Sequence, residues 1–146
     1  MGAAMAARLL WIEESEIERE TVVQLLAQAG IDVVVAERVA EAERLLDQGG
    51  FDLVILDVMM PIEEEDEARG YGAEGEGGME TGLVLLGRMS RQIFACPKGL
   101  MVVTMRLEDG IRDKFIAAGV PPSRFFTKYQ LRDAREFRDK VLEALS

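Results

Sequence analysis

A short apolar segment, Leu53–Leu56, lies between polar residues and runs directly into an aspartate, Asp57. Four consecutive apolar residues without alternation are typical of a strand that is buried on both faces, and such strands occur in parallel sheets covered by helices. Open α/β sheets bind their ligands at the carboxyl ends of the strands. The segment therefore predicts a parallel α/β sheet with Asp57 at its functional edge.

The rest of the sequence alternates between predicted strands and predicted helices. Four other short apolar segments are predicted to be strands: residues 8–12, 31–36, 100–104 and 124–127. Five segments have apolar residues at helical spacing: residues 14–29, 39–46, about 80–89, 108–118 and 131–145. The order βαβαβαβαβα implies a doubly wound parallel sheet with right-handed crossovers and helices on both faces.

The length of 146 residues is that of one domain, and a hydrophobic fraction of 49% allows a proper core. We expect residues 1–7 to be a disordered lead-in and residues 8–146 to form the domain. The single cysteine, Cys96, excludes an internal disulfide and suits a reducing cytosol. No segment approaches the apolar length of a transmembrane helix. A cytoplasmic protein without membrane contact is therefore expected.

The negative charge is concentrated in one part of the chain. The net charge is -10, and residues 62–80 contain eight acidic residues and one basic residue. Because residues 62–78 are also rich in glycine, we predict that they form a long, mobile insertion loop. An acidic surface without a basic patch argues against nucleic-acid binding. The absence of histidine excludes histidine-based zinc sites and catalytic triads.

Polar residues stand at the ends of four predicted strands. Glu13 and Glu14 follow the first strand, Asp57 ends the third, Thr104 ends the fourth, and Lys128 follows the fifth. Carboxylates that converge repel each other unless a cation neutralises them, and Mg2+ prefers such oxygen ligands. A hydroxyl and an ammonium group can bind phosphoryl oxygens. The pattern therefore predicts a site for Mg2+ and a phosphoryl group.

These strand ends, together with the sequence LVILDVMMP around Asp57, resemble the receiver domain of bacterial two-component response regulators. The resemblance extends from Arg8 to Leu145. It implies the flavodoxin-like fold of the CheY-like superfamily, with strand order 2-1-3-4-5. It also implies that Asp57 accepts a phosphoryl group from a histidine kinase or a phosphotransfer protein.

The same resemblance assigns roles to the other residues. Four residues would hold the cation: Glu13, Glu14, Asp57 and, through its backbone carbonyl, Met59. Three would bind the phosphoryl group or respond to it: Thr104 as the switch hydroxyl, Lys128 as the phosphate-binding lysine, and Phe125 as the switch aromatic. The surface of the fourth helix, fifth strand and fifth helix would contact an output protein or form a homodimer.

The sequence departs from the family pattern close to this site. Glu14 stands where aspartate is usual, which affects a cation as demanding of geometry as Mg2+. Met105 stands where a small residue is usual, and its side chain narrows the approach to Asp57. The acidic insertion at residues 62–78 lies directly beside the site, where it can cover Asp57, repel an anionic donor or recruit a partner.

Two functions remain open at this point. The first is a stand-alone receiver that is phosphorylated on Asp57 and signals by protein contact, since no output domain follows Ser146. The second is a pseudo-receiver, which has the same fold but acts as an interaction module without phosphorylation. An enzyme is not expected beyond self-catalysed phosphotransfer and dephosphorylation. A haloacid-type phosphatase, for example, needs a second aspartate where Met59 stands.

Overall fold

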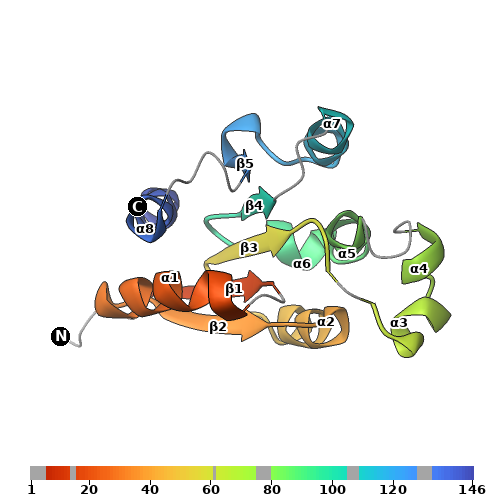
Figure 1. Cartoon of the computed structure of the whole chain (residues 1–146), viewed down its shortest axis with the longest axis horizontal. Helices are drawn as coiled ribbons and strands as arrows, with labels where there is room; N and C mark the ends of the chain where they lie inside the picture. Colours follow the sequence, from red (N-terminus) through yellow and green to blue (C-terminus); the bar gives the residue numbers. More distant parts are fainter. Residues whose placement is uncertain (1–5, 14–15, 61, 75–79, 105–108, 128–132) are drawn as a thin grey trace.

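The computed structural model describes residues 6–13, 16–60, 62–74, 80–104, 109–127 and 133–146 (Figure 1). Its centre is a parallel sheet with the strand order β2-β1-β3-β4-β5. The five strands are β1 (Arg8–Ile12), β2 (Asp32–Ala36), β3 (Leu53–Asp57), β4 (Leu100–Thr104) and β5 (Phe125–Thr127). The predicted fold class and strand order are confirmed.

Helices cover both faces of the sheet. One face carries α1 (Glu16–Gln28) and α8 (Ala134–Leu145), which pack against each other. The other face is covered by four helices: α2 (Val39–Gln48), α5 (Thr81–Arg88), α6 (Ser90–Phe94) and α7 (Asp109–Ala117). A 3-10 turn, η1 (Pro122–Arg124), leads into β5. None of the described helices is long and apolar enough to cross a membrane.

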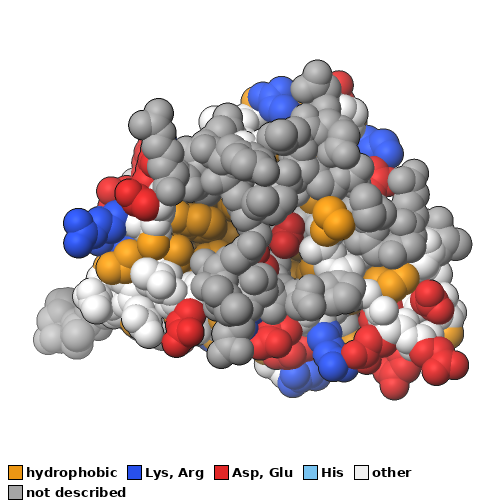
Figure 2. Space-filling view, viewed as in Figure 1, with side chains coloured by type: hydrophobic (Ala, Val, Ile, Leu, Met, Phe, Trp, Pro, Cys, Tyr) orange, Lys and Arg blue, Asp and Glu red, His pale blue; other side chains and the backbone are white. Residues whose placement is uncertain are grey.

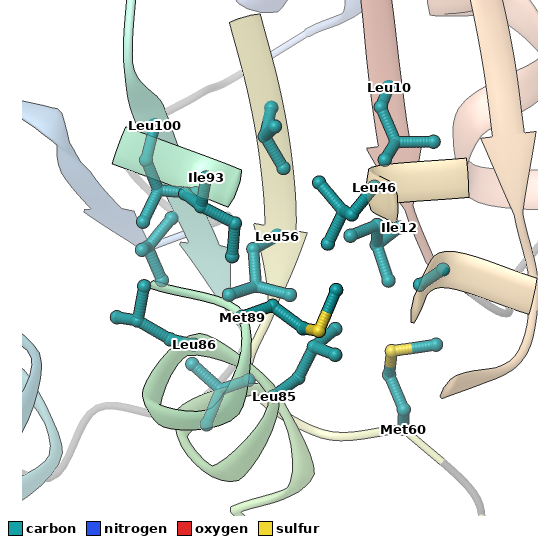
Figure 3. Close-up of a cluster of buried hydrophobic side chains, with 14 of the residues drawn as sticks. Leu10, Ile12, Leu46, Leu56, Met60, Leu85, Leu86, Met89, Ile93 and Leu100 are labelled. Atoms are coloured by element: carbon teal, nitrogen blue, oxygen red, sulfur yellow. The ribbon is translucent and has the colours of Figure 1, made fainter. Parts of the chain in front are cut away.

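The strands divide their side chains between two hydrophobic cores, because successive residues of a strand point to opposite faces. In β1, Leu9 and Trp11 face α1 and α8, whereas Leu10 and Ile12 face α2 and α5. Trp11 is almost fully buried, and its ring centroid lies 5.0 Å from that of Phe137 in α8. Figure 3 shows the core on the α2 and α5 side, where Leu10, Ile12 and the side chains of α5 converge.

The prediction that residues 62–78 form a loop is wrong for the described part of that segment. Two short helices occupy it, α3 (Glu64–Ala68) and α4 (Tyr71–Glu74). A capping box starts α3: the Glu63 side chain accepts from the backbone of Asp66, and the Asp66 carboxylate accepts from the Glu63 backbone N–H at 2.9 Å. Satisfying these end groups stabilises a helix of one turn that would otherwise be marginal.

The insertion is also anchored to the body of the domain. Tyr71 is fully buried, and its hydroxyl donates to Glu43 of α2 at 2.5 Å. Arg69 forms an ion pair with the same Glu43, and the guanidinium of Arg88 in α5 lies 4.2 Å from the centre of the Tyr71 ring. Burial, and then the Glu43 carboxylate, raise the pKa of Tyr71 well above its usual value. The acidic segment therefore buries an aromatic side chain that the charge pattern does not indicate.

Other predicted boundaries shift by a few residues. The predicted helix at about 80–89 ends at Arg88 and is followed by the separate helix α6. The predicted final helix at 131–145 begins at Ala134, because Asp133 caps it by accepting from the Glu136 backbone N–H at 2.8 Å. Residues 1–5, the beginning of the predicted lead-in, lie outside the described residues.

Candidate functional site

The strand register places three of the predicted site residues at one edge of the sheet. Ile12 of β1 pairs with Leu56 of β3, so the next residues along, Glu13 and Asp57, extend the same register. Thr104 ends β4 at this edge and pairs with Thr127, the last residue of β5. All three strands run parallel, so Glu13, Asp57 and Thr104 share the carboxyl edge.

Glu13 is held firmly at the end of β1. It is only 2% exposed, and its backbone N–H donates to the carbonyl of Ala36 at 3.0 Å. Its own carbonyl accepts from the guanidinium of Arg19 in α1 at 2.8 Å. Arg19 is itself buried and pairs with Glu37 at 2.8 Å. Arg19 thus connects the segment after β1 with the segment after β2, and sequence reasoning did not identify it.

Asp57 is partly exposed, in contrast to the four buried residues that precede it in β3. Its Oδ1 atom accepts from the backbone N–H of Met59 at 3.4 Å, a long and therefore weak bond. The Met59 side chain is 39% exposed. The Asp57 carboxylate is therefore carried by the end of a buried strand and is partly exposed there.

The first turn of α5 lies against the backbone that carries Asp57. The Gly82 N–H donates to the carbonyl of Val58 at 2.8 Å, and the Thr81 hydroxyl donates to the carbonyl of Met60 at 2.9 Å. A Cβ atom at Gly82 would lie 2.1 Å from the Asp57 carbonyl oxygen, so only glycine fits. Sequence reasoning treated Gly82 only as the end of the insertion. A threonine followed by a glycine at the start of a predicted helix was the sequence signal for this close contact between helix and strand.

Thr104 and Phe125 are both turned into the protein. Thr104 is fully buried at the end of β4. Phe125 is 8% exposed, and its ring centroid lies 5.8 Å from that of Phe115 in α7. Phe125 therefore belongs to the core beneath α7 in this conformation.

Glu14, Lys128 and Met105 lie outside the described residues, so the structure gives no position for them. Within the described ranges, no group of three or more His, Cys, Asp or Glu side chains could hold a metal ion. The described donors for a cation are the carboxylates of Glu13 and Asp57 and the carbonyl of Met59. These are oxygen atoms, as a hard cation such as Mg2+ requires, and Glu14 would be the third carboxylate.

Acidic side chains gather on the surface of the insertion. Figure 2 shows them at the lower right, over α3 and the neighbouring end of α2. The exposed members in α3 and its cap are Glu63, Glu64, Glu65 and Glu67. Arg38, from the body of the domain, forms an ion pair with Glu63 at 2.6 Å, and both side chains are more than half exposed.

Part of the chain matches a known protein family. Residues 9–64 match the family model described as the response regulator receiver domain. That segment contains Glu13, Asp57 and Met59, and it ends at Glu64, just inside the insertion. Over these residues the chain carries the sequence pattern of the receiver domain family, and its five-stranded sheet has the fold of that family. No curated protein sequence matches this chain.

Solved structures resemble the chain over nearly its whole length. A CheY-like response regulator receiver domain protein from Methanospirillum hungatei JF-1 has a TM-score of 0.71 and 19% identity, covering 96% of this chain and 94% of its own. An orphan response regulator of H. pylori has a TM-score of 0.70 and 14% identity, covering 99% and 100%. A response regulator from Burkholderia pseudomallei with a phosphorylated aspartic acid and a calcium ion has a TM-score of 0.66 and 18% identity, covering 96% and 66%.

Proposed function

We propose that this chain is a phosphoacceptor receiver in which Asp57 takes a phosphoryl group from a histidine kinase or a phosphotransfer protein. The observation that carries the proposal is the β1–β3 register, which sets the buried Glu13 beside the partly exposed Asp57 at the carboxyl edge. The match to the receiver family over residues 9–64 supports it. Receiver domains are generally phosphoacceptors rather than enzymes in the usual sense.

The chemistry follows from the placement of the side chains. A carboxylate oxygen of Asp57 attacks the phosphorus of a phosphohistidine, a P–O bond forms, the P–N bond breaks, and the donor imidazole leaves. An aspartyl phosphate results. The Thr104 hydroxyl donates to one of its oxygens, and the ammonium group of Lys128 pairs with another. Thr104 lies at the carboxyl end of β4, where its hydroxyl is fully buried.

Mg2+ is the cation that receiver domains generally bind, and the oxygen donors of this site fit it. Glu13, Glu14, Asp57 and the carbonyl of Met59 would hold it. When bound, the ion offsets the negative charge of the transferring phosphoryl oxygens, which is the main requirement of phosphoryl transfer. Arg19 assists indirectly, because it holds the backbone of Glu13 in place.

Incubation with acetyl phosphate and Mg2+ tests this function, with intact-protein mass as the readout. We expect a mass increase of one phosphoryl group that is absent from Asp57→Asn. Asp32→Asn is a matched control, because Asp32 begins β2 at the opposite edge of the sheet and should not affect the modification. If neither acetyl phosphate nor beryllofluoride modifies or binds the wild-type chain, a pseudo-receiver that acts by protein contact is the better account.

We place the output or self-association surface on α7, β5 and α8. Phe115 of α7 and Phe125 of β5 pack against each other in the core on the α7 side of the sheet. A change in conformation at the end of β3 or β4 could reach this surface through that packing. Arg135 is exposed on α8, whereas Arg138 is engaged with Asp139 at 2.9 Å. Charge reversal at Arg135 therefore tests the surface without breaking an ion pair recorded among the described residues. Self-association or partner binding unchanged in Arg135→Glu, with and without phosphorylation, would contradict this placement.

A further inference from the structure

A buried acid joins the first turn of α5 to helix α7. Glu80 is the N-cap residue of α5 and is only 4% exposed. Lys114 of α7 donates to its Oε1 atom at 2.7 Å, while the Lys114 side chain is about half exposed. A buried carboxylate is costly unless a cation and hydrogen bonds compensate it. The pair therefore connects α7 with the start of α5.

The same turn of α5 holds the backbone that follows Asp57. Directly after Glu80, the Thr81 hydroxyl donates to the carbonyl of Met60, and the Gly82 N–H donates to the carbonyl of Val58. The close approach of Gly82 to the Asp57 carbonyl prevents α5 from moving toward β3, and these two hydrogen bonds oppose movement away from it. A displacement of this turn is therefore transmitted to the backbone beside the phosphoacceptor.

Helix α7 reaches the other side of the switch region. Phe115, the residue after Lys114, packs on Phe125 with ring centroids 5.8 Å apart. Residues 114 and 115 thus contact, respectively, the cap of α5 and the aromatic residue of β5. The contacts form one continuous chain from the backbone of Asp57, through Glu80 and Lys114, to Phe125.

We propose that Glu80 is a positioning residue whose ion pair with Lys114 couples the backbone around Asp57 to the placement of α7. The proposal rests on the proposed function for its regulatory meaning, because the state of Asp57 is what α7 would report. Coupling of this kind is reciprocal, so weakening the pair at α7 must be felt at Asp57. Breaking the pair destabilises the conformation in which Asp57 is unmodified, and it favours the alternative conformation that a phosphoryl mimic selects.

The test is a double-mutant cycle of Lys114→Met and Glu80→Gln, read by amide hydrogen exchange. In Lys114→Met we expect the Gly82 amide and the α7 amides to exchange roughly fivefold faster or more, while the β1 amides serve as an internal reference. Arg112→Met is the matched control, because it removes a positive charge from the exposed surface of α7. In the Glu80→Gln background, Lys114→Met should have little further effect on Gly82.

A second measurement connects the pair to the state of Asp57. With Mg2+ present, we expect Lys114→Met to bind beryllofluoride severalfold more tightly than either the wild type or Arg112→Met. Gly82 exchange that is unchanged in Lys114→Met, or that changes equally in Arg112→Met, overturns the proposal. So does an unchanged or weaker affinity for beryllofluoride in Lys114→Met when the wild type binds it. If no variant binds beryllofluoride, the phosphoacceptor function fails, and the exchange cycle alone still decides whether Glu80 couples the two elements.

Discussion

Gly82 of α5 lies against the carbonyl oxygen of Asp57 so closely that a Cβ atom between them would be 2.1 Å from that oxygen. A second backbone contact is also close, since the same hypothetical Cβ would lie 3.0 Å from the Cα of Val58. The obstacle is backbone and not a flexible side chain, so it cannot move aside cheaply. The end of β3 and the first turn of α5 are therefore packed backbone against backbone.

The substitution Gly82→Ala should lower the free energy of unfolding by about 2–4 kcal/mol, because the added methyl group forces α5 away from β3. Gly87 in the same helix has open space at its Cβ position, so Gly87→Ala is the control. It should be neutral or stabilising by up to about 1 kcal/mol, since alanine favours a helix. Urea unfolding of both variants measures this difference, and equal effects would contradict the close approach.

Arg19 and Arg38 both form ion pairs, but the Arg19 side chain is buried and the Arg38 side chain is exposed. The Arg19 side chain is 7% exposed, binds Glu37 and also donates to the carbonyl of Glu13. We expect Arg19→Met to cost about 1–3 kcal/mol of stability, because a buried carbonyl loses its donor. Arg38→Met removes an ion pair with Glu63 that is mostly exposed, and it should cost less than about 1 kcal/mol. Thermal unfolding compares them, and similar losses would argue against a special role for Arg19.

The buried Tyr71 hydroxyl, which donates to Glu43, predicts that the stability of the protein depends on pH. The pKa of Tyr71 is raised in the folded protein, first by burial and then by the Glu43 carboxylate, so the folded state keeps the phenol proton to higher pH than the unfolded chain. This contribution is fully present below the ordinary tyrosine pKa of 10.0 and is lost as the pH rises above that value. At neutral pH, Tyr71→Phe should cost about 1 kcal/mol through the lost hydrogen bond.

The check is the difference in unfolding free energy between the wild type and Tyr71→Phe, measured by urea unfolding from pH 7 upward. The excess free energy of unfolding of the wild type over Tyr71→Phe should decrease progressively above about pH 10. Other groups that titrate at high pH are common to both proteins and cancel in the difference. A constant difference across that range would show that the Tyr71 hydroxyl titrates alike in the folded and unfolded states.

Removal of one carboxylate should weaken the cation site. If Glu13 holds the cation as proposed, Glu13→Gln should lower the affinity for Mg2+ by about tenfold, a change of about 1.4 kcal/mol, because a neutral amide replaces a carboxylate. Titration calorimetry with MgCl2 measures it, and Asp32→Asn at the other sheet edge is the control. An affinity that falls equally in both variants would indicate nonspecific binding to the acidic surface.

The sheet could be predicted from the sequence because each strand is a short apolar segment, and the three central strands β1, β3 and β4 are buried almost throughout. The segment at Leu53–Leu56 is buried along its whole length, and Asp57 emerges at its end as the pattern indicates. Because parallel strands share one carboxyl edge, the arrangement of Glu13, Asp57 and Thr104 follows from local patterns alone.

The insertion could not be predicted in the same way, because its stability depends on residues far away in the chain. The partner of Tyr71 is Glu43, 28 positions earlier, and the ring is covered by Arg88. Dense negative charge and glycine normally indicate disorder, and nothing local reveals that one aromatic side chain is buried. The pairing of Glu80 with Lys114 spans 34 positions and is hidden for the same reason.

The two ends of the insertion are joined by contacts that do not involve its contents. Met60 and Val58 at its entrance accept hydrogen bonds from Thr81 and Gly82 at its exit. Peptides of different length or composition can therefore be exchanged between these ends with little strain on Asp57, since doubling the length of a flexible loop costs only about 0.6 kcal/mol. The sequence between these two ends can therefore vary while the contacts beside Asp57 stay the same.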